Sequence, residues 1–485
     1  MAAGAPAQPQ ATTRLPFADI AASHRKRMAD DGAPEVAIHA FLRALRYVAD
    51  GSDGCIREAT LADIGVLPTA DELQADAARW SALGLAALDR VAVLKLNGGL
   101  GTTMGMRGPK SLVEIRDGRC FLDLVAEQVL ALRGRSRRRI PLIFMDSFRT
   151  QAQTLTHLQR HFDLNVGLPL DFLQHRVPKV LADSLLPVSL DIPGVDPELC
   201  WCPPGHGDLY PALVSSGLLA KLRADGVEWL FCSNVDNLGA TLDLAIFGYV
   251  TQCGAPLVME VAQRTAADRK GGHLGRATDG GLLLRESAQC AAEDRDAFAD
   301  LDRHRYFNTN TLWLHLPTLA TALAAHGGSL DLPVIVNRTR LDPNEARSPA
   351  AIQLESAMGA AIAVLPGAAA LAVPRSRFAP VKSAADLLAL RSDRFEIAAD
   401  ATLQVCGDGP VPTIDLDERH YRTVDDLALR FPHGVPSMRE LLRLRLRGDV
   451  RFGAGVTLRG EVDLAAPDGE IRWISAGAVI SDRDT

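Results

Sequence analysis

A glycine-rich stretch at residues 94–112, LKLNGGLGTTMGMRGPKSL, has residue types and spacing suited to binding an anion. The apolar run VAVLKL ends at Asn97, five glycines lie within the next eleven residues, and Lys110 follows. Glycines let a backbone curl so that several N–H groups point at one anion, and a lysine adds a compact positive charge. The stretch therefore predicts a phosphate-binding loop after a strand.

Two well-known phosphate-binding loops are excluded by single positions. A Walker A loop, GxxxxGK[ST], needs glycine before the lysine, and Pro109 occupies that position. A dinucleotide fingerprint, GxGxxG, aligned on Gly99 and Gly101 needs glycine where Met104 stands. A nicotinamide dehydrogenase is therefore a runner-up only, and another kind of phosphate-binding loop is expected.

A carboxylate, Asp236, follows a second apolar run in the segment VEWLFCSNVD. Magnesium at nucleotide sites is bound by one or two carboxylates together with phosphate oxygens. Ligands of open α/β sheets bind beyond the carboxyl ends of the strands, where both Asp236 and the glycine-rich loop are expected. Asp236 is therefore the candidate metal ligand, and an aspartate that caps a turn is the alternative.

The elements that position these residues follow from the hydrophobic pattern. Helical periodicity is clear in EVAIHAFLRALRYV, residues 35–48. Farther along, short apolar runs alternate with helical stretches, which predicts an α/β domain with a mostly parallel sheet. Residues 448–482 have short apolar pairs separated by Gly and Asp, typical of a small β-solenoid. The expected organisation is a disordered tail (1–16), a helical region (17–90), an α/β domain (91–390) and a C-terminal domain with a short β-helix (391–485).

The composition limits which binding partners and which cellular compartment are expected. The formal net charge of the 485 residues is -7, so neither nucleic acid nor an anionic membrane is an expected partner. An uncharged apolar stretch at 357–373 is broken by Pro366-Gly367, which predicts a helix end, a turn and a buried strand instead of a membrane span. The eight cysteines form no CxxC pair, as is typical of packing cysteines in a reducing cytoplasm.

One further pattern, HLQRH, places His157 and His161 four residues apart. Histidines at this spacing share a helix face and could suggest a metal pair. The pattern lacks the glutamate of an HExxH motif, however, so two surface histidines are expected.

Eight motifs in a fixed order extend the argument beyond the glycine-rich loop. They are LNGGLGTTMGMRGPKS (96–111), FLQHRVP (172–178), PPGHGDLY (203–210), FCSNVDNLGAT (231–241), KGGHL (270–274), FNTNTLW (307–313), IQLES (352–356) and VPRSRFAPVK (373–382). Together they resemble, in the same order, the motifs of the eukaryotic-type UDP-glucose pyrophosphorylase family, and they extend over most of residues 91–390.

The resemblance implies a fold, a reaction and a metal. The fold would be α/β: a Rossmann-like, GT-A-like nucleotidyltransferase mixed sheet with a helical N-terminal segment and a small C-terminal left-handed β-helix domain. UTP and glucose 1-phosphate would give UDP-glucose and pyrophosphate by in-line attack on the α-phosphate, with Mg²⁺ as cofactor at Asp236. A phosphate dianion is already a nucleophile, so no general base is needed. The oligomeric state stays open, because the chain ends early in the solenoid that supports assembly in animal and fungal members.

The resemblance also implies roles for matching residues. Lys110 and Lys382 would be the catalytic cations, with Lys382 bridging the α-phosphate and the attacking phosphate. Gln174 would read the uracil edge, since an amide offers a donor and an acceptor. The implied substrate-binding residues are Leu96, Asn97, Gly98, Gly99, Gly101, Thr102, Gln174, Gly205, His206, Asn234, Val235, Asp236, Gly272, Asn308, Asn310 and Glu355. Among them His206 would lie near the sugar phosphate, and Asn308 and Asn310 near the sugar hydroxyls.

Three positions depart from the family pattern, all expected near the sugar pocket. His273 and Ser356 each stand where threonine is usual, and Thr311 stands where asparagine is usual. A UDP-N-acetylhexosamine or other UDP-sugar pyrophosphorylase is therefore the alternative reading. A catalytically inactive nucleotide sensor is a second alternative, which the joint presence of both lysines and Asp236 disfavours.

Overall fold

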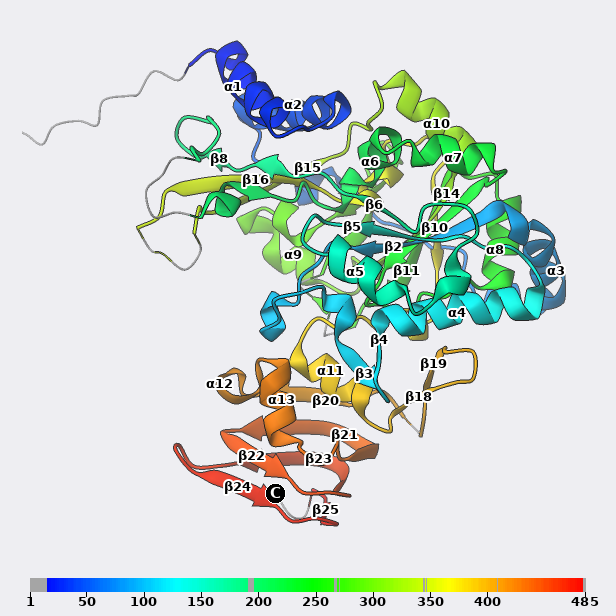
Figure 1. Cartoon of the computed structure of the whole chain (residues 1–485), viewed down its shortest axis with the longest axis vertical. Helices are drawn as coiled ribbons and strands as arrows, with labels where there is room; N and C mark the ends of the chain where they lie inside the picture. Colours follow the sequence, from blue (N-terminus) through cyan, green and yellow to red (C-terminus); the bar gives the residue numbers. More distant parts are fainter. Residues whose placement is uncertain are drawn as a thin grey trace, which may run out of the picture.

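The computed structural model describes residues 15–190, 196–265, 268–269, 271–342, 345, 347–407 and 409–482. Figure 1 shows three parts along the long axis: two N-terminal helices, a large α/β body and a smaller C-terminal β body. Only the last two residues of the disordered tail expected over 1–16 lie within the described part. None of the described helices is long and apolar enough to cross a lipid bilayer.

A mixed sheet of ten strands forms the centre of the large body. Along the order β1-β12-β14-β10-β2-β5-β6, the last four strands are parallel to one another, whereas β14 is antiparallel to β10. β11 and β17 continue from β14 as a branch, and β13 pairs with β12. The strands are β1 Leu61–Ala62, β2 Val91–Asn97, β5 Leu142–Asp146, β6 Asp171–Leu173, β10 Trp229–Asn234, β11 Leu257–Gln263, β12 His273–Ala277, β13 Leu282–Arg285, β14 Tyr306–His315 and β17 Ala369–Ala372.

The mostly parallel sheet expected from strand and helix alternation is thus corrected to a mixed one. A strand covered on both faces is apolar along its whole length whichever way it runs, so the pattern locates a strand without giving its direction. In the stretch 357–373, the expected turn and buried strand are present, but the helical part is the 3₁₀ segment Met358–Ala363.

Helices cover both faces of the sheet. Val91 and Val93 of β2 belong to one apolar core, and the intervening Ala92 and the following Leu94 belong to another, because successive strand residues face opposite sides. The first core includes residues of α3 Ala77–Ala87, α4 Phe121–Ser136 and α8 Leu244–Gln252. The second includes residues of α6 Leu209–Ser215, α7 Leu218–Ala224 and α10 Leu316–Ala325. Two further helices of this body are α5 Gln151–Leu158 and α9 Arg295–Ala299.

The N-terminal helices pack on a separate small sheet. α1 Phe17–Asp30 and α2 Glu35–Ala49 share a core with the sheet formed by β8 Val180–Leu181, β15 Val334–Arg340 and β16 Ala350–Ser356. Between α2 and α3 the chain is mainly irregular, and its short strand β1 joins the edge of the central sheet. The helical pattern expected for residues 17–90 therefore corresponds to three helices with an irregular segment between the second and third. A short ladder nearby joins β7 Val177–Pro178 and β9 Trp201–Cys202.

The C-terminal body is built mainly from stacked parallel strands. β20 Thr413–Leu416, β21 Ser437–Arg447, β23 Thr457–Ala465 and β25 Val479–Ile480 form one parallel sheet, and β22 Asp449–Phe452 pairs with β24 Ile471–Ile474 in another. Successive parallel strands are the arrangement expected of solenoid turns. The remaining elements are α11 Ala384–Arg391, β18 Phe395–Ile397, β19 Leu403–Val405, α12 Glu418–Tyr421 and α13 Val424–Arg430.

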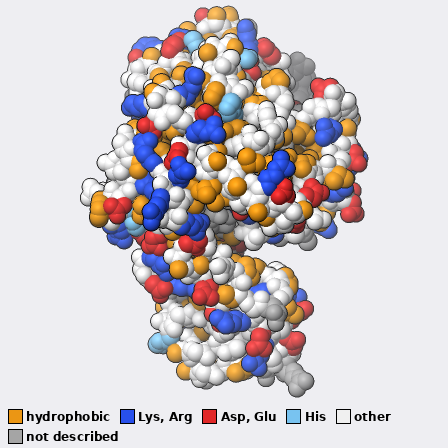
Figure 2. Space-filling model, turned by 90° about the vertical axis from the view of Figure 1, so that its right-hand side faces the viewer, with side chains coloured by type: hydrophobic (Ala, Val, Ile, Leu, Met, Phe, Trp, Pro, Cys, Tyr) orange, Lys and Arg blue, Asp and Glu red, His pale blue; other side chains and the backbone are white. Residues whose placement is uncertain are grey.

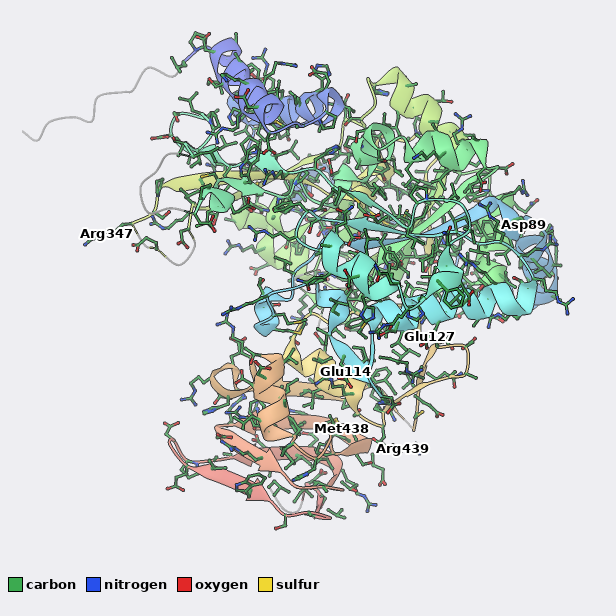
Figure 3. The ribbon with its side chains drawn as sticks, viewed as in Figure 1. Asp89, Glu114, Glu127, Arg347, Met438 and Arg439 are labelled. Atoms are coloured by element: carbon green, nitrogen blue, oxygen red, sulfur yellow. The ribbon has the colours of Figure 1, made fainter. Side chains whose placement is uncertain are left out.

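The two bodies meet at a narrow waist, visible in Figure 2. The hairpin of β3 Glu114–Arg116 and β4 Arg119–Cys120 extends from the large body toward the small one. The guanidinium group of Arg116 donates hydrogen bonds to the carbonyl oxygens of Phe395 at 2.7 Å and Arg391 at 3.0 Å. In Figure 3, Glu114 marks this hairpin, and Met438 marks β21 below it. The glycine-rich loop is therefore followed directly by the hairpin that contacts the C-terminal body.

Candidate active site

The glycine-rich loop folds back on itself, so its two ends are adjacent. The backbone N–H of Lys110 donates to Gly99 O at 3.1 Å, and that of Gly101 donates to Gly108 O at 3.2 Å. The left-handed residue Gly105, with φ 76°, turns the loop tip, where an added Cβ would lie 2.7 Å from Cγ2 of Thr423 in the C-terminal body. Lys110, which ends the loop in sequence, therefore lies beside the start of the loop in space.

Lys110 and Asp236 are brought together by two neighbouring strands. Leu96 of β2 is paired with Asn234 of β10, and the N–H of Val235 donates to Leu96 O at 3.1 Å. The loops that follow the two strands therefore start side by side. The ammonium group of Lys110 forms an ion pair with the carboxylate of Asp236, and both side chains are largely buried. The candidate metal ligand thus lies at the strand edge, as expected, in contact with the loop lysine.

Gln174 lies against the first glycine of the loop. Its backbone N–H donates to Asp146 O at 2.8 Å, and its side-chain Oε1 lies 2.9 Å from the position of an added Cβ on Gly98. Asn97 is buried, and its Nδ2 donates to Asp146 Oδ1 at 2.7 Å and to Thr154 Oγ1 at 2.9 Å. The side-chain N–H groups of Asn97 are therefore used inside the protein to hold the end of β2.

The 204–208 loop contacts the end of β16. An added Cβ on Gly205, with φ 78°, would lie 2.4 Å from Ser356 O, so only glycine fits this close approach. His206 Nδ1 accepts a hydrogen bond from the backbone N–H of Met358 at 2.9 Å. Burial lowers the pKa of His206 to about 4. The imidazole is therefore neutral at pH 7 and carries its proton on Nε2, which can act as a hydrogen-bond donor.

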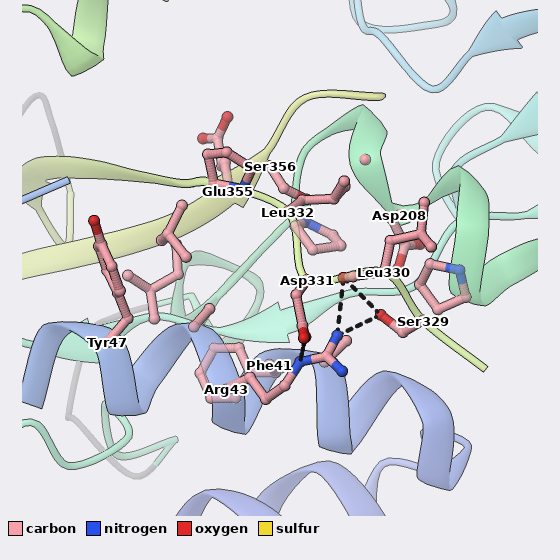
Figure 4. A pocket seen from close by; sticks show the side chains of 18 of the residues that line it. Phe41, Arg43, Tyr47, Asp208, Ser329, Leu330, Asp331, Leu332, Glu355 and Ser356 are labelled. Atoms are coloured by element: carbon pink, nitrogen blue, oxygen red, sulfur yellow. Dashed lines mark hydrogen bonds and ion pairs between the residues drawn. The ribbon is translucent and has the colours of Figure 1, made fainter. Parts of the chain in front are cut away.

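A cavity of about 550 Å³ lies between α2 and the β15/β16 strands. Glu355 and Ser356 line it, and Arg43 lies at its edge, where Nε pairs with Asp331 Oδ1 at 2.9 Å (Figure 4). Burial raises the pKa of Glu355, and Asn337 Nδ2 donates to its Oε1 at 2.9 Å. The residues lining this cavity do not include Lys110, Asp236 or Lys382, so the cavity adjoins the predicted site without containing its charged centre.

Asparagines from two strands form a connected group. Asn310 has a left-handed backbone with φ 56°, and its Nδ2 donates to Asn234 Oδ1 at 2.7 Å. Its backbone N–H donates to Asn308 Oδ1 at 2.9 Å, and the N–H of Asn308 donates to Gly272 O at 3.2 Å. An added Cβ on Gly272 would lie 2.3 Å from Oε2 of Glu286, a carboxylate whose pKa is raised by burial. The structure thus adds Glu286, which is isolated from any motif in the sequence, to this group.

Lys382 is exposed and lies against two aromatic rings. Its Nζ is 5.6 Å from the centroid of Phe307 and 5.7 Å from that of Phe378. The preceding segment is fixed beside the Asp236 loop, because Asn237 Oδ1 accepts the N–H of Ala379 at 2.9 Å. The structure brings the backbone near Lys382 to this edge of the sheet without a described contact between Lys382 and either Lys110 or Asp236.

The segment before Lys382 has a buried anchor that sequence reasoning missed. Arg377 donates to both carboxylate oxygens of Glu260, at 2.7 and 2.8 Å, and Trp313 Nε1 donates to the same group at 2.9 Å. Lys95 of β2 is also fully buried, with Nζ donating to Ser233 Oγ at 2.7 Å and Ala240 O at 2.8 Å. Burial lowers the pKa of Lys95 to about 7. A lysine inside the run VAVLKL is the sequence signal that could have identified it.

Two of the three departures from the family pattern are core residues. His273 is fully buried, and its ring stacks on His304 with centroids 3.9 Å apart. Thr311 is fully buried on β14, opposite Glu260 of β11. Of the three side chains, Ser356 alone lines the described cavity.

Comparison with known proteins decides the family. The sequence pattern of the UTP–glucose-1-phosphate uridylyltransferase family matches residues 56–459. This chain belongs to that family. It therefore has the uridylyltransferase activity for which the family is named, which forms UDP-glucose from UTP and glucose 1-phosphate.

Individual relatives extend the match over nearly the whole chain. The UTP–glucose-1-phosphate uridylyltransferase of Saccharomyces cerevisiae is 41% identical over 398 residues, which cover 81% of this chain and 78% of the yeast protein. The Solanum tuberosum enzyme is 38% identical over 400 residues, covering 82% and 81%. A crystal structure of a UDP-glucose pyrophosphorylase mutant from Leishmania major in complex with UDP-glucose is 39% identical, with a TM-score of 0.87 over 96% of this chain and 98% of that chain. The mixed sheet, N-terminal helices and C-terminal parallel sheet are therefore the family fold.

Proposed function

We propose that uridylyl transfer takes place at the edge of the central sheet where β2 and β10 end. The observation that carries this proposal is the ion pair between Lys110 and Asp236, which places a loop cation and a carboxylate on adjacent strand ends. A bound triphosphate gives Lys110 a second anion to contact. The carboxylate of Asp236 is then free to bind a cation that accompanies the nucleotide.

Mg²⁺ fits this position. Asp236 supplies a carboxylate whose side chain keeps some solvent exposure, and Mg²⁺ at nucleotide sites needs only one or two carboxylates besides phosphate oxygens and water. When bound, the ion supplies charge neutralisation at the triphosphate. We assign Asp236 as the residue of this chain that holds it.

Lys382 is proposed as the cation at the attacking phosphate. The phosphate of glucose 1-phosphate needs no deprotonation, so the protein must align it with the departing pyrophosphate and compensate charge. The 377–380 segment fixes the backbone before Lys382, while the side chain itself is exposed and able to reorient toward a ligand. The ammonium group of Lys382 lies over the rings of Phe307 and Phe378 and would move from them to the phosphates when substrate binds.

Recognition of the base and sugar is assigned mainly to amide, imidazole and backbone groups. Gln174, next to Gly98, would pair with the uracil edge, and the Nε2–H of neutral His206 would donate to the sugar phosphate. Leu96, Gly99, Gly101, Thr102, Gly205 and Val235 would contribute backbone or packing contacts to the nucleotide. Gly272, Asn234, Asn308, Asn310 and Glu355 would contact the ribose or the sugar, and UDP-glucose would be the bound product.

Three wider proposals accompany this assignment. The chain divides into a helical region (17–90), a catalytic domain (91–390) and a C-terminal domain (391–485) whose stacked strands turn as a left-handed β-helix. A cytoplasmic location is supported by eight cysteines that are all free.

Sugar choice is tested by pyrophosphate release from UTP and Mg²⁺ with a panel of sugar 1-phosphates. We expect kcat/KM to be highest with glucose 1-phosphate. A higher value with N-acetylglucosamine 1-phosphate or galactose 1-phosphate would contradict the proposed specificity.

A further inference from the structure

Four potential metal ligands, none of which is assigned to the transfer reaction, lie between α4 and α5. Cys120 and Asp123 lie at the start of α4, and His157 and His161 lie at the end of α5 and just after it. Figure 1 shows these two helices side by side at the lower edge of the large body. The two histidines are those of HLQRH, which the sequence alone suggested were surface residues.

The donor atoms are directed at one another. Nε2 of His157 and Nε2 of His161 each lie 2.8 Å from the same oxygen, Oδ1 of Asp123. Sγ of Cys120 lies 3.1 Å from Asp123 Oδ2 and 3.2 Å from Nε2 of His157. Within the described residues, ligand atoms of Cys120, Asp123 and His157 all lie within 4.8 Å of one another. His161 is outside this group of three and joins the cluster through Asp123.

The spacing suits a tetrahedral ion. Zinc bonds of about 2.0–2.3 Å to nitrogen, oxygen and sulfur place neighbouring ligand atoms roughly 3.3–3.8 Å apart. For Cys120, Asp123 and His157, the present separations of 2.8–3.2 Å need to widen by only about half an ångström. His161, which already lies 2.8 Å from Asp123 Oδ1, has to move closer to Cys120 and His157 to complete the tetrahedron. The side chains of His157 and His161 are 16% and 14% exposed, so an ion can enter from solvent, whereas Asp123 is held in the interior.

Part of the cluster has a structural explanation, and part has none. Asp123 accepts the backbone N–H of Cys120 at 2.9 Å, which forms a capping box for α4. Capping does not require a thiol at the cap position or two imidazoles on one carboxylate oxygen. The guanidinium group of Arg160 is 3.7 Å from Asp123 Oδ1, but its side chain is 56% exposed and can turn away.

We propose that Cys120, Asp123, His157 and His161 form a Zn²⁺ site that fastens the start of α4 to the end of α5. The mixture of one thiolate, one carboxylate and two imidazoles favours zinc over magnesium, because Mg²⁺ prefers oxygen ligands. The site is therefore distinct in chemistry from the one assigned to Asp236. Its two anionic ligands balance the charge of the ion.

Binding changes the protonation of the ligands in a defined way. The S–H bond of Cys120 breaks, its proton leaves to solvent, and a sulfur–zinc bond forms. Each imidazole binds the ion through Nε2 and carries its proton on Nδ1. The hydrogen bonds that now join the four side chains are replaced by bonds to the metal.

The site is tested on the full chain after chelator treatment and dialysis. Zn²⁺ is added, unbound metal is removed by gel filtration, and bound zinc is counted by mass spectrometry, with affinity measured against a chromophoric chelator. We expect one zinc per chain, and at least tenfold weaker binding in His157→Gln/His161→Gln. His433→Gln, which changes an exposed histidine in the C-terminal body, is the matched control and should bind as the wild type does.

Two further readouts separate a ligand role from a folding defect. Zn²⁺ should raise the melting temperature of the wild type but not that of the double variant, because only a ligand of the folded state stabilises it. Co²⁺ in place of zinc should give a thiolate charge-transfer band that is lost in Cys120→Ser. Absence of bound zinc in the wild type, or unchanged zinc affinity in a folded double variant, would overturn the proposal.

Discussion

The ion pair between Lys110 and Asp236 joins the end of the glycine-rich loop to the end of β10. It exists because β2 and β10 are parallel neighbours and their following loops begin side by side. The pair links the two halves of the proposed site, since one partner is assigned to the triphosphate and the other to its metal ion. Substitutions at each partner should therefore affect the reaction strongly.

Lys110→Ala removes a positive charge from the proposed triphosphate site. We expect kcat/KM for UTP to fall by about a hundredfold or more, as is usual when a charged group that stabilises the transition state is lost. Steady-state pyrophosphate release measures this, with Lys221→Ala on the exposed side of α7 as the control. Equal losses in both variants would argue against a specific role.

Lys382→Ala should lower kcat by about a hundredfold or more while leaving the melting temperature unchanged. The side chain is exposed, so its removal leaves no buried group unpaired. Lys382→Arg should recover part of the activity because it keeps the charge. Wild-type turnover in Lys382→Ala would remove this residue from the mechanism.

Gly98→Ala tests whether Gln174 is positioned by the loop. An added Cβ would lie 2.9 Å from Gln174 Oε1, so the amide must move away from its place beside the loop. We expect KM for UTP to rise by about tenfold with a smaller change in kcat, as for loss of one or two hydrogen bonds. Gly134→Ala on α4, where an added Cβ meets nothing within 4 Å, is the matched control.

The pH dependence of stability tests the buried lysine of β2. Burial lowers the pKa of Lys95 from 10.5 to about 7, so between these values the unfolded chain binds a proton that the folded chain does not. The contribution of Lys95 to the free energy of unfolding must therefore rise as the pH increases over that interval. Below pH 7, the destabilisation caused by burying the charged ammonium group is fully present.

Lys95→Met removes this titration while keeping a long side chain in the core. In urea unfolding at pH 7, 8, 9 and 10, the wild type should gain stability relative to Lys95→Met as pH rises. A difference between the two proteins that stays constant across this range would show that Lys95 keeps an ordinary pKa in the folded state.

Much of the fold could be predicted from the sequence because its strands are strongly apolar. The apolar run VAVLKL makes up β2 except for its last residue, and β5 and β10 lie within IPLIFMDS and VEWLFCSNVD. The helical pattern FLDLVAEQVLALRG lies within α4. The direction of β14 could not be predicted, because it depends on which strand lies beside it. The irregular segment between α2 and α3 was also missed, since it is held by contacts with the distant strand β12.

Residues of the candidate site could be predicted only where they are polar residues of a motif that follows or interrupts an apolar strand. Lys110 and Asp236 were placed correctly at one edge because parallel neighbours end together. Glu286 and Glu260 were not found, since each depends on partners more than twenty residues away. The cluster around Asp123 was missed for the same reason, because its side chains come from the start of α4 and from the end of α5 and the residues after it.

The most direct test of the account is pyrophosphate release by Asp236→Asn at saturating UTP and glucose 1-phosphate over a range of Mg²⁺ concentrations. We predict a fall in turnover of about a hundredfold or more. The Mg²⁺ concentration needed for half-maximal rate should also increase, because an amide binds the ion more weakly than a carboxylate. The exposed variant Asp71→Asn should behave as the wild type does. Wild-type turnover with an unchanged Mg²⁺ requirement in Asp236→Asn would contradict the proposed site.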